Sequence, residues 1–309
     1  RGYHLTTQLF TFPTFSGKIA SISRFYVSIV LFHKMNPQTL PSISWGFTTQ
    51  NYLEFIQPTL KSARSFLSEA RLLGLQWLEL RDPNASLSLD DCRELAAYAE
   101  LLGLEVNYSA QRGLLANDLE TILPLAIANT ACFKGPRTVR ILALRGSEKE
   151  GWTEAEFKAV LKNAQMAAQH AAKAGLSLSI ENADVALFGK AGSYRGMDDL
   201  FAAMDKSIRW QLDTANLFLG PVAVSPQDAA RFIERFGSRV SYLHVKTAGP
   251  TTALPTLSDN PLDFVEVFQL LAGHNRIYAV IELASDKSPE TIRENFQQGL
   301  GYLRDKKLF

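Results

Sequence analysis

The chain has 309 residues, of which 46% are hydrophobic and 20% are charged. A chain of this length and composition can bury a large core as one large domain or as two smaller ones, and its composition is that of an ordinary globular protein. Its 32 basic and 31 acidic residues are interspersed, so no basic stripe is present to neutralise phosphates. The sequence therefore argues against nucleic acid as the main partner.

The first 34 residues differ in pattern from the rest of the chain. They begin without Met and show no helical or strand period, and their apolar run from Tyr26 to Phe32 is too short to span a bilayer. We interpret residues 1–34 as a non-native or disordered extension and Met35 as the true start. An export or anchor segment is the alternative, although no small-residue cleavage site follows the apolar run. Residues 35–309 then form the folded domain, with no membrane partner expected.

The two cysteines, Cys92 and Cys132, lie in segments that read as helical. Neither belongs to a CxxC motif or a Cys/His pair, so the sequence predicts no disulfide framework and no zinc knuckle. A reduced, cytoplasmic setting fits, and the sequence leaves a homo-oligomer open.

After Pro41 the chain repeats one theme, in which a short β-rich run, a polar loop and an amphipathic helix follow one another. The predicted strands begin near Ile43, Leu75, Leu104, Thr138, Leu176, Ile208, Val240 and Ile277. The predicted helices run from Leu60 to Leu73, Leu89 to Leu102, Asp118 to Cys132, Glu154 to Ala174, Met197 to Met204, Pro226 to Phe236, Leu262 to Ala272 and Pro289 to Leu303.

Helix ends support these boundaries. Ser88 with Asp91 and Thr153 with Glu156 resemble capping boxes. Five glycines stand just past predicted helices, where we expect left-handed residues to end the last turn. They are Gly74, Gly103, Gly175, Gly237 and Gly273.

Strict alternation of strand and helix predicts a parallel sheet with right-handed crossovers. Eight units close most naturally into a single-domain (β/α)8 TIM barrel, whose typical size of about 250 residues matches Met35 to Phe309. A doubly wound sheet is the alternative, but no Gly-x-Gly-x-x-Gly follows the first strand.

Four strands end in an ionisable residue, about one strand–helix unit apart. The four residues are Glu181, Asp213, His244 and Glu282. In the run from Leu176 the bulky residues share one face, which must meet the helices, so Glu181 points into the barrel. The same phase turns Asp213 inward. For His244 and Glu282 the alternation is weaker, and the inward orientation is assigned by analogy.

Barrel enzymes place their catalytic groups at the carboxyl ends of the strands, and neighbouring strands lie about 4.8 Å apart. Three carboxylates that converge there repel one another unless a cation compensates them. Three oxygen ligands and one imidazole suit a divalent ion, Mn²⁺ first, with Co²⁺, Mg²⁺ or Zn²⁺ as alternatives. The alternative is that the four are unrelated polar residues, each with its own hydrogen-bond partners at its strand end.

These motifs resemble the sugar phosphate isomerase/epimerase superfamily of xylose isomerase-like barrels. The resemblance spans Ile43 to about Leu303 through Ile180-Glu181-Asn182, Leu212-Asp213-Thr214-Ala215-Asn216, Leu243-His244-Val245-Lys246 and Val280-Ile281-Glu282. It implies that the four strand-end residues hold one metal ion. It also implies that Glu181 and Glu282 are the acid/base pair that moves a proton beside a carbonyl of a small sugar, polyol or keto-acid derivative, in carbohydrate metabolism.

One position departs from that pattern. Ketose 3-epimerases carry His three residues after the ligand Asp, and this chain has Asn216 there. Asn can donate a hydrogen bond but cannot titrate, so the metal site stands while the ketose substrate is in doubt.

Further residues are candidates for binding substrate. Lys246 matches a family lysine two residues beyond His244, and Arg145 suits a phosphate or carboxylate, as does Arg140. Glu79 matches a substrate-binding Glu of the family, but a buried pairing with Arg81 or Arg145 fits equally well. The remaining candidates are Asn107, Asn182 and Asn216.

The predicted function is therefore a metal-dependent sugar isomerase or epimerase. A lyase on an inosose- or dehydroshikimate-type substrate is the runner-up, because it begins with the same proton abstraction. A phosphodiesterase of the endonuclease IV type would need a three-metal cluster with several His ligands, and His244 is the only strand-end histidine. A non-catalytic sugar-binding barrel is disfavoured because both Glu181 and Glu282 are present.

Overall fold

The structure is a computed structural model that describes residues 40–143, 150–183, 185–190, 193–220, 222–284 and 288–309. The extension interpreted from residues 1–34 lies outside the described residues, and so does Arg145. Among the helices of the described ranges, none is both long and apolar enough to cross a membrane.

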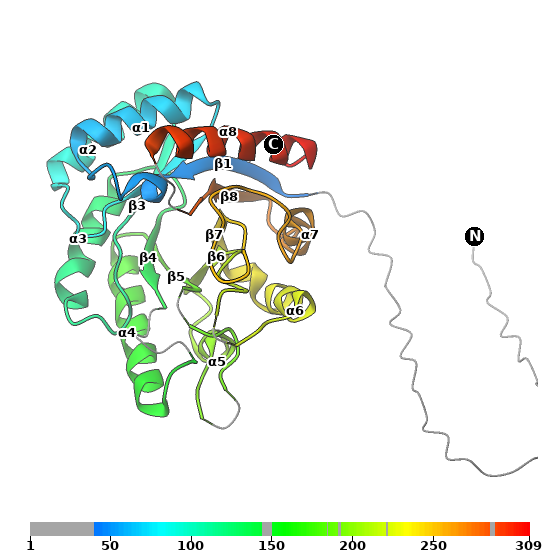
Figure 1. The fold of residues 1–309 in the computed structure, drawn as a ribbon. Coiled ribbons are helices and arrows are strands. Elements are labelled where there is room, and N and C mark those ends of the chain that lie inside the picture. Colours follow the sequence, from blue (N-terminus) through cyan, green and yellow to red (C-terminus); the bar gives the residue numbers. More distant parts are fainter. Residues whose placement is uncertain (1–39, 144–149, 184, 191–192, 221, 285–287) are drawn as a thin grey trace, which may run out of the picture. The chain divides into compact units, whose positions relative to one another are not determined.

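In the described ranges, eight strands alternate with eight α-helices (Figure 1), and each lies within a few residues of its predicted place. The strands are β1 (Ser42–Thr48), β2 (Trp77–Arg81), β3 (Glu105–Ser109), β4 (Thr138–Leu142), β5 (Ser177–Glu181), β6 (Arg209–Asp213), β7 (Val240–Val245) and β8 (Arg276–Ile281). The helices are α1 (Leu60–Leu72), α2 (Leu89–Leu102), α3 (Leu119–Ala131), α4 (Glu154–Lys173), α5 (Met197–Ala203), α6 (Pro226–Phe236), α7 (Phe264–Leu270) and α8 (Pro289–Asp305).

The strands form one parallel sheet in the order β3-β2-β1-β8-β7-β6-β5-β4, which curls into a nearly closed barrel. The predicted (β/α)8 fold is confirmed. Between the described strands β3 and β4 no ladder forms. Instead the Thr138 N–H donates to Asn107 Oδ1 at 3.4 Å, and the Leu142 N–H donates to the Arg112 carbonyl at 2.8 Å. The loop after β3 thus covers part of the exposed edge of β4.

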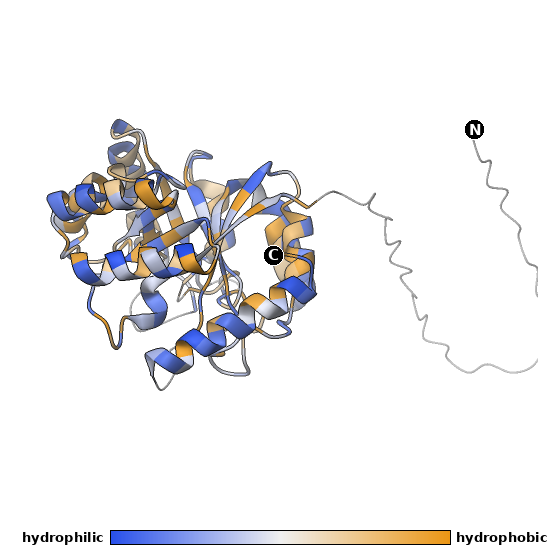
Figure 2. Cartoon of the chain, turned by 90° about the horizontal axis from the view of Figure 1, so that it is seen from above, coloured by the Kyte–Doolittle hydropathy of each residue, from blue (hydrophilic) through white to orange (hydrophobic). Residues whose placement is uncertain are grey.

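The helices pack their apolar faces on the outside of the sheet, and Figure 2 shows hydrophilic and hydrophobic residues side by side along them. Trp210 on β6 packs against Phe201 of α5 and Phe232 of α6, with ring centroids 5.7 and 5.2 Å away. Trp210 therefore faces the helices. Gln211 and Asp213, which lie on the other face of β6, face the interior, as predicted for Asp213.

The predicted helix ends are partly confirmed. Both predicted capping boxes are present, at Ser88 and Thr153. Gly74, Gly103 and Gly175 have positive φ, as expected, but Gly237 has φ −58° and Gly273 also lies outside the left-handed region. The prediction for these two was wrong. After α6 a 3-10 turn (Gly237–Arg239) continues the chain and needs no left-handed residue, and Gly273 lies in a turn after α7.

Aromatic side chains fill the barrel below its ionisable layer. Trp77 of β2 lies edge-on to Tyr242 of β7 and Tyr278 of β8, with ring centroids 5.7 and 5.4 Å away. The Trp77 indole N–H donates to the Ser44 carbonyl at 2.9 Å, so the ring is fixed. Glu79 and His244 come two residues after Trp77 and Tyr242 on β2 and β7, so the ionisable layer lies next to this aromatic layer.

Candidate metal centre

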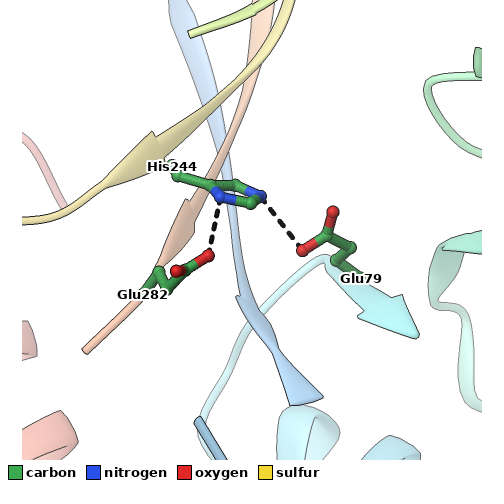
Figure 3. Close-up of side chains that lie close together, drawn as sticks. All are labelled: Glu79, His244 and Glu282. Atoms are coloured by element: carbon green, nitrogen blue, oxygen red, sulfur yellow. Dashed lines mark ion pairs between the residues drawn. The ribbon is translucent and has the colours of Figure 1, made fainter. Parts of the chain in front are cut away.

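The imidazole of His244 stands at the centre of the ionisable cluster at the carboxyl ends of the strands. It comes from β7 and is fully buried. Its two nitrogens face different carboxylates (Figure 3): Glu282 Oε2 lies 2.6 Å from Nδ1, and Glu79 Oε2 lies 3.0 Å from Nε2. The ring is therefore held between the middle of β2 and the residue that follows β8.

The Nδ1 side of His244 is where the strand-end residues gather. Glu181 Oε1 lies 3.7 Å from Nδ1 and Asp213 Oδ2 lies 3.8 Å from it, in addition to Glu282. All three carboxylates are buried, with exposed fractions of 3%, 0% and 6% in the order Glu181, Asp213, Glu282. The structure thus brings together the four residues that the sequence predicts as ligands. Their role as ligands stays a prediction.

Asp213 is held in place by its neighbours. Its Oδ1 accepts hydrogen bonds of 2.9 Å from the N–H groups of Ala215 and Asn216. Asn182 Oδ1 accepts from the Asp213 N–H at 2.9 Å and from the Trp210 indole at 3.1 Å, while its Nδ2 donates to the Asp213 carbonyl at 3.0 Å. These bonds aim Asp213 Oδ2 at His244. They also engage both polar atoms of the Asn182 side chain.

Two cations, Arg140, which is buried, and Lys246, which is partly buried, pair with the predicted acid/base residues. The guanidinium of Arg140, from β4, contacts Glu181 and also donates through Nε to Gln211 Oε1 at 3.0 Å. Burial lowers the pKa of Arg140 to about 10, so the group stays charged at neutral pH. Lys246 Nζ lies 2.6 Å from Glu282 Oε1.

The pKa shifts follow from burial and from these partners. Burial raises the pKa of Asp213. For Glu282 burial acts in the same direction, but Lys246 and His244 outweigh it and hold the pKa well below its usual value. Burial disfavours protonated His244, yet the carboxylates of Glu79 and Glu282 raise its pKa overall. The cluster thus attracts positive charge at the point where its carboxylates meet.

Several buried atoms at this point have no hydrogen-bond partner within the described part of the chain. On the Nδ1 side of the ring they are Asp213 Oδ2, Glu282 Oε2 and His244 Nδ1, and on the other side they are Glu79 Oε2 and His244 Nε2. Buried polar atoms without partners are costly, and a cation among three oxygens and one nitrogen would satisfy those on the Nδ1 side together. Glu181, Asp213 and His244 present ligand atoms within 4.8 Å of one another, and so do Glu79, His244 and Glu282. The donor set therefore fits a divalent ion.

The remaining predicted site residues have varied surroundings. Glu79 is fully buried and lies 3.5 Å from Arg81, which bears out the alternative of a buried pairing. Asn107 lies at the seam between β3 and β4. Asn216 is half-buried just after Asp213, and Lys246 reaches Glu282. The substrate-binding roles of these residues stay predictions.

Sequence reasoning passed over two members of the cluster. Arg140 was weighed only as an anion ligand, and Tyr242, whose hydroxyl donates to Glu79 Oε1 at 2.9 Å, was assigned no role. A signal was present in both cases. Arg140 interrupts the apolar run Val139 to Ile141, and Tyr242 shares the face of His244.

No protein-family model matches the chain, and no curated protein matches it in sequence. Solved structures do match in fold, at low identity. D-psicose 3-epimerase from Clostridium cellulolyticum H10, determined with D-tagatose, is 13% identical with a TM-score of 0.60, over 84% of this chain and 98% of that one. The 3-keto-D-glucoside 4-epimerase of E. coli is 16% identical with a TM-score of 0.61, over 85% and 100%.

A third match is a xylose isomerase-like TIM barrel protein from Mycobacterium smegmatis in complex with magnesium. It is 16% identical with a TM-score of 0.60, over 85% of this chain and 96% of that one. The chain thus shares the (β/α)8 barrel fold of these three structures, which agrees with the fold that the resemblance implies.

Proposed function

We propose that the protein is a divalent-metal-dependent isomerase or epimerase of a small sugar, polyol or keto-acid derivative. The observation that carries this proposal is the meeting of three buried carboxylates around His244 Nδ1. Glu181, Asp213, His244 and Glu282 would hold the ion, with Mn²⁺ preferred. The epimerases among the fold neighbours support the reaction class, and the magnesium complex of one neighbour supports the metal.

The ion would polarise a substrate carbonyl and its neighbouring hydroxyl and so favour loss of the adjacent proton. Glu181 ends β5 and Glu282 directly follows β8, and the two would flank the substrate. One carboxylate would take the proton from carbon on one face and so become protonated. The other would take a proton from a substrate hydroxyl or from water and deliver it to carbon on the opposite face. Arg140 pairs with Glu181, and Lys246, which pairs with Glu282, would bind a substrate oxygen.

A lyase acting on an inosose- or dehydroshikimate-type substrate is the second candidate. The observation that favours it is Asn216, which follows Asp213 at the position where ketose 3-epimerases carry His. Loss of a β-hydroxyl after the same proton abstraction would then take the place of reprotonation.

One screen tests the proposal and separates the two candidates. Ketoses, inososes and keto-acids are incubated with the Mn²⁺-loaded protein in D₂O, and each mixture is followed by NMR. Deuterium incorporation without loss of water indicates epimerisation or isomerisation, and loss of water indicates a lyase. We expect Glu181→Gln and Glu282→Gln to abolish turnover.

Metal content provides the matching control. We expect bound Mn²⁺ to drop in Asp213→Ala and in His244→Ala. Stoichiometric metal in both variants would contradict the assigned centre.

A further inference from the structure

We propose that Glu79 is a positioning residue: its carboxylate holds the proton of His244 on Nε2, which leaves the Nδ1 lone pair free to bind the metal. This inference rests on the proposed function, because it assumes that a metal binds at the centre. It assigns Glu79 a role different from the substrate contact that the family resemblance implies.

Each oxygen of Glu79 faces another side chain. Glu79 Oε2 and His244 Nε2 have no hydrogen-bond partner elsewhere in the described residues, and they face each other. Oε2 lies 3.0 Å from His244 Nε2, and Oε1 accepts a hydrogen bond of 2.9 Å from the Tyr242 hydroxyl. Arg81 Nη1 lies 3.5 Å from the same Oε1. The side chain of Glu79 is fully buried, so a substrate in the barrel mouth would have to displace these partners to reach it.

The geometry also separates Glu79 from the other carboxylates. The imidazole lies between Glu79 and Glu282, and it presents opposite edges to them (Figure 3). Glu181 and Asp213 approach Nδ1, the edge that faces Glu282. An ion bound to Nδ1 can therefore meet three carboxylates, whereas on the Nε2 side the nearest carboxylate is that of Glu79.

A neutral imidazole carries one N–H, and the hydrogen bond made by one nitrogen decides which nitrogen can bind a metal. Carboxylates behind metal-binding histidines fix the tautomer, hold the ring in orientation and make the ligand more basic. Glu79 satisfies the structural conditions for this role, since it is itself fixed by Tyr242 and Arg81. With an ion bound to Nδ1, contacts would run without a break from Glu79 through His244 to the metal.

The test compares wild type with Glu79→Gln, which keeps the shape of the side chain and removes its charge. Tyr242→Phe is the matched control, because it removes a hydrogen bond to Glu79 and leaves the carboxylate beside His244. Mn²⁺ affinity is measured by electron paramagnetic resonance of free Mn²⁺ during titration. We expect Glu79→Gln to bind Mn²⁺ roughly 10- to 100-fold more weakly and Tyr242→Phe to stay within a few-fold of wild type.

A second readout needs no variant. In wild-type protein loaded with diamagnetic Zn²⁺, ¹⁵N NMR of the His244 ring should show a protonated Nε2 and a metal-bound Nδ1. Coordination through Nε2 would make Glu79 a ligand and overturn the inference. Equal Mn²⁺ affinity in wild type and Glu79→Gln would also overturn it while leaving the proposed function intact. Absence of metal binding in wild type would refute both.

Discussion

At the scale of single residues, the centre contains more cations than a simple metal site requires. Glu79, Glu181 and Glu282 lie beside Arg81, Arg140 and Lys246, in that order. Asp213 is the exception, since its contacts are with backbone N–H groups and with His244. Asp213 Oδ2 is thus the ligand atom that most needs a cation, which agrees with the raised pKa of its carboxyl.

The pair of Arg140 and Glu181 leads to a prediction about stability. In Arg140→Met the buried carboxylate of Glu181 loses its cation, and loss of one partner of a buried pair costs about 3–5 kcal/mol. A bound metal would compensate the same charge, so we expect the loss in free energy of unfolding to be smaller with Mn²⁺ than with EDTA. Urea denaturation of wild type and variant, with Mn²⁺ and with EDTA, measures this loss.

Lys134→Met is the control for this prediction. Lys134 pairs with Glu100 at 2.6 Å, but both side chains are largely exposed, so we expect little change in either buffer. A cost for Arg140→Met that is the same with and without Mn²⁺ would show that no ion reaches Glu181.

The candidate metal ligands could be predicted from the sequence, whereas the cations that pair with them could not. Strand phase turned Glu181 and Asp213 inward, because a residue between two bulky neighbours on a barrel strand has only the interior left to face. Arg140 could not be paired in this way. In the β4–β5 register it stands opposite Ser179, and its long side chain reaches past that residue to Glu181. Side-chain reach of this kind is absent from strand periodicity.

At the scale of elements, the strand and helix boundaries were predictable because the pattern repeats eight times. The gap between β3 and β4 was not predictable, since it depends on where the loop around Arg112 and Gly113 lies rather than on either strand. Gly46 was likewise passed over. It lies on β1 inside the barrel, where its lack of a side chain leaves room for Trp77.

We predict that Gly46→Ala destabilises the barrel. A Cβ at this position would lie 2.4 Å from the Trp77 carbonyl oxygen and 2.8 Å from its ring. The ring cannot move freely, because its N–H donates to the Ser44 and Ala279 carbonyls. Overpacking of this kind costs about 1–3 kcal/mol in free energy of unfolding, which urea denaturation measures.

Gly301→Ala on α8 is the matched control. A Cβ there meets nothing within 4 Å, and replacing a helical Gly by Ala stabilises by about 0.5–1 kcal/mol. Gly46→Ala and Gly301→Ala should therefore change stability in opposite directions. An unchanged stability for Gly46→Ala would mean that β1 and β2 can separate at this point without loss.

At the scale of the whole molecule, the centre joins strands that are far apart in the chain. Ligand candidates come from β5, β6, β7 and the end of β8, and Glu79 comes from β2. An ion held by these residues would bind the folded barrel and not the unfolded chain, which lacks a preformed site. Metal binding should therefore stabilise the fold as a whole, beyond its effect on the centre.

The size of this effect can be predicted. Free Mn²⁺ at a hundred times its dissociation constant should raise the free energy of unfolding by about 2.7 kcal/mol, and EDTA should reverse the gain. Denaturation at increasing Mn²⁺ concentration measures it. In Asp213→Ala the gain should vanish, because the carboxylate without a cationic side-chain partner is gone. A Mn²⁺-dependent gain that persists in this variant would place the ion elsewhere, since stabilisation follows the residues that hold the metal in the folded state.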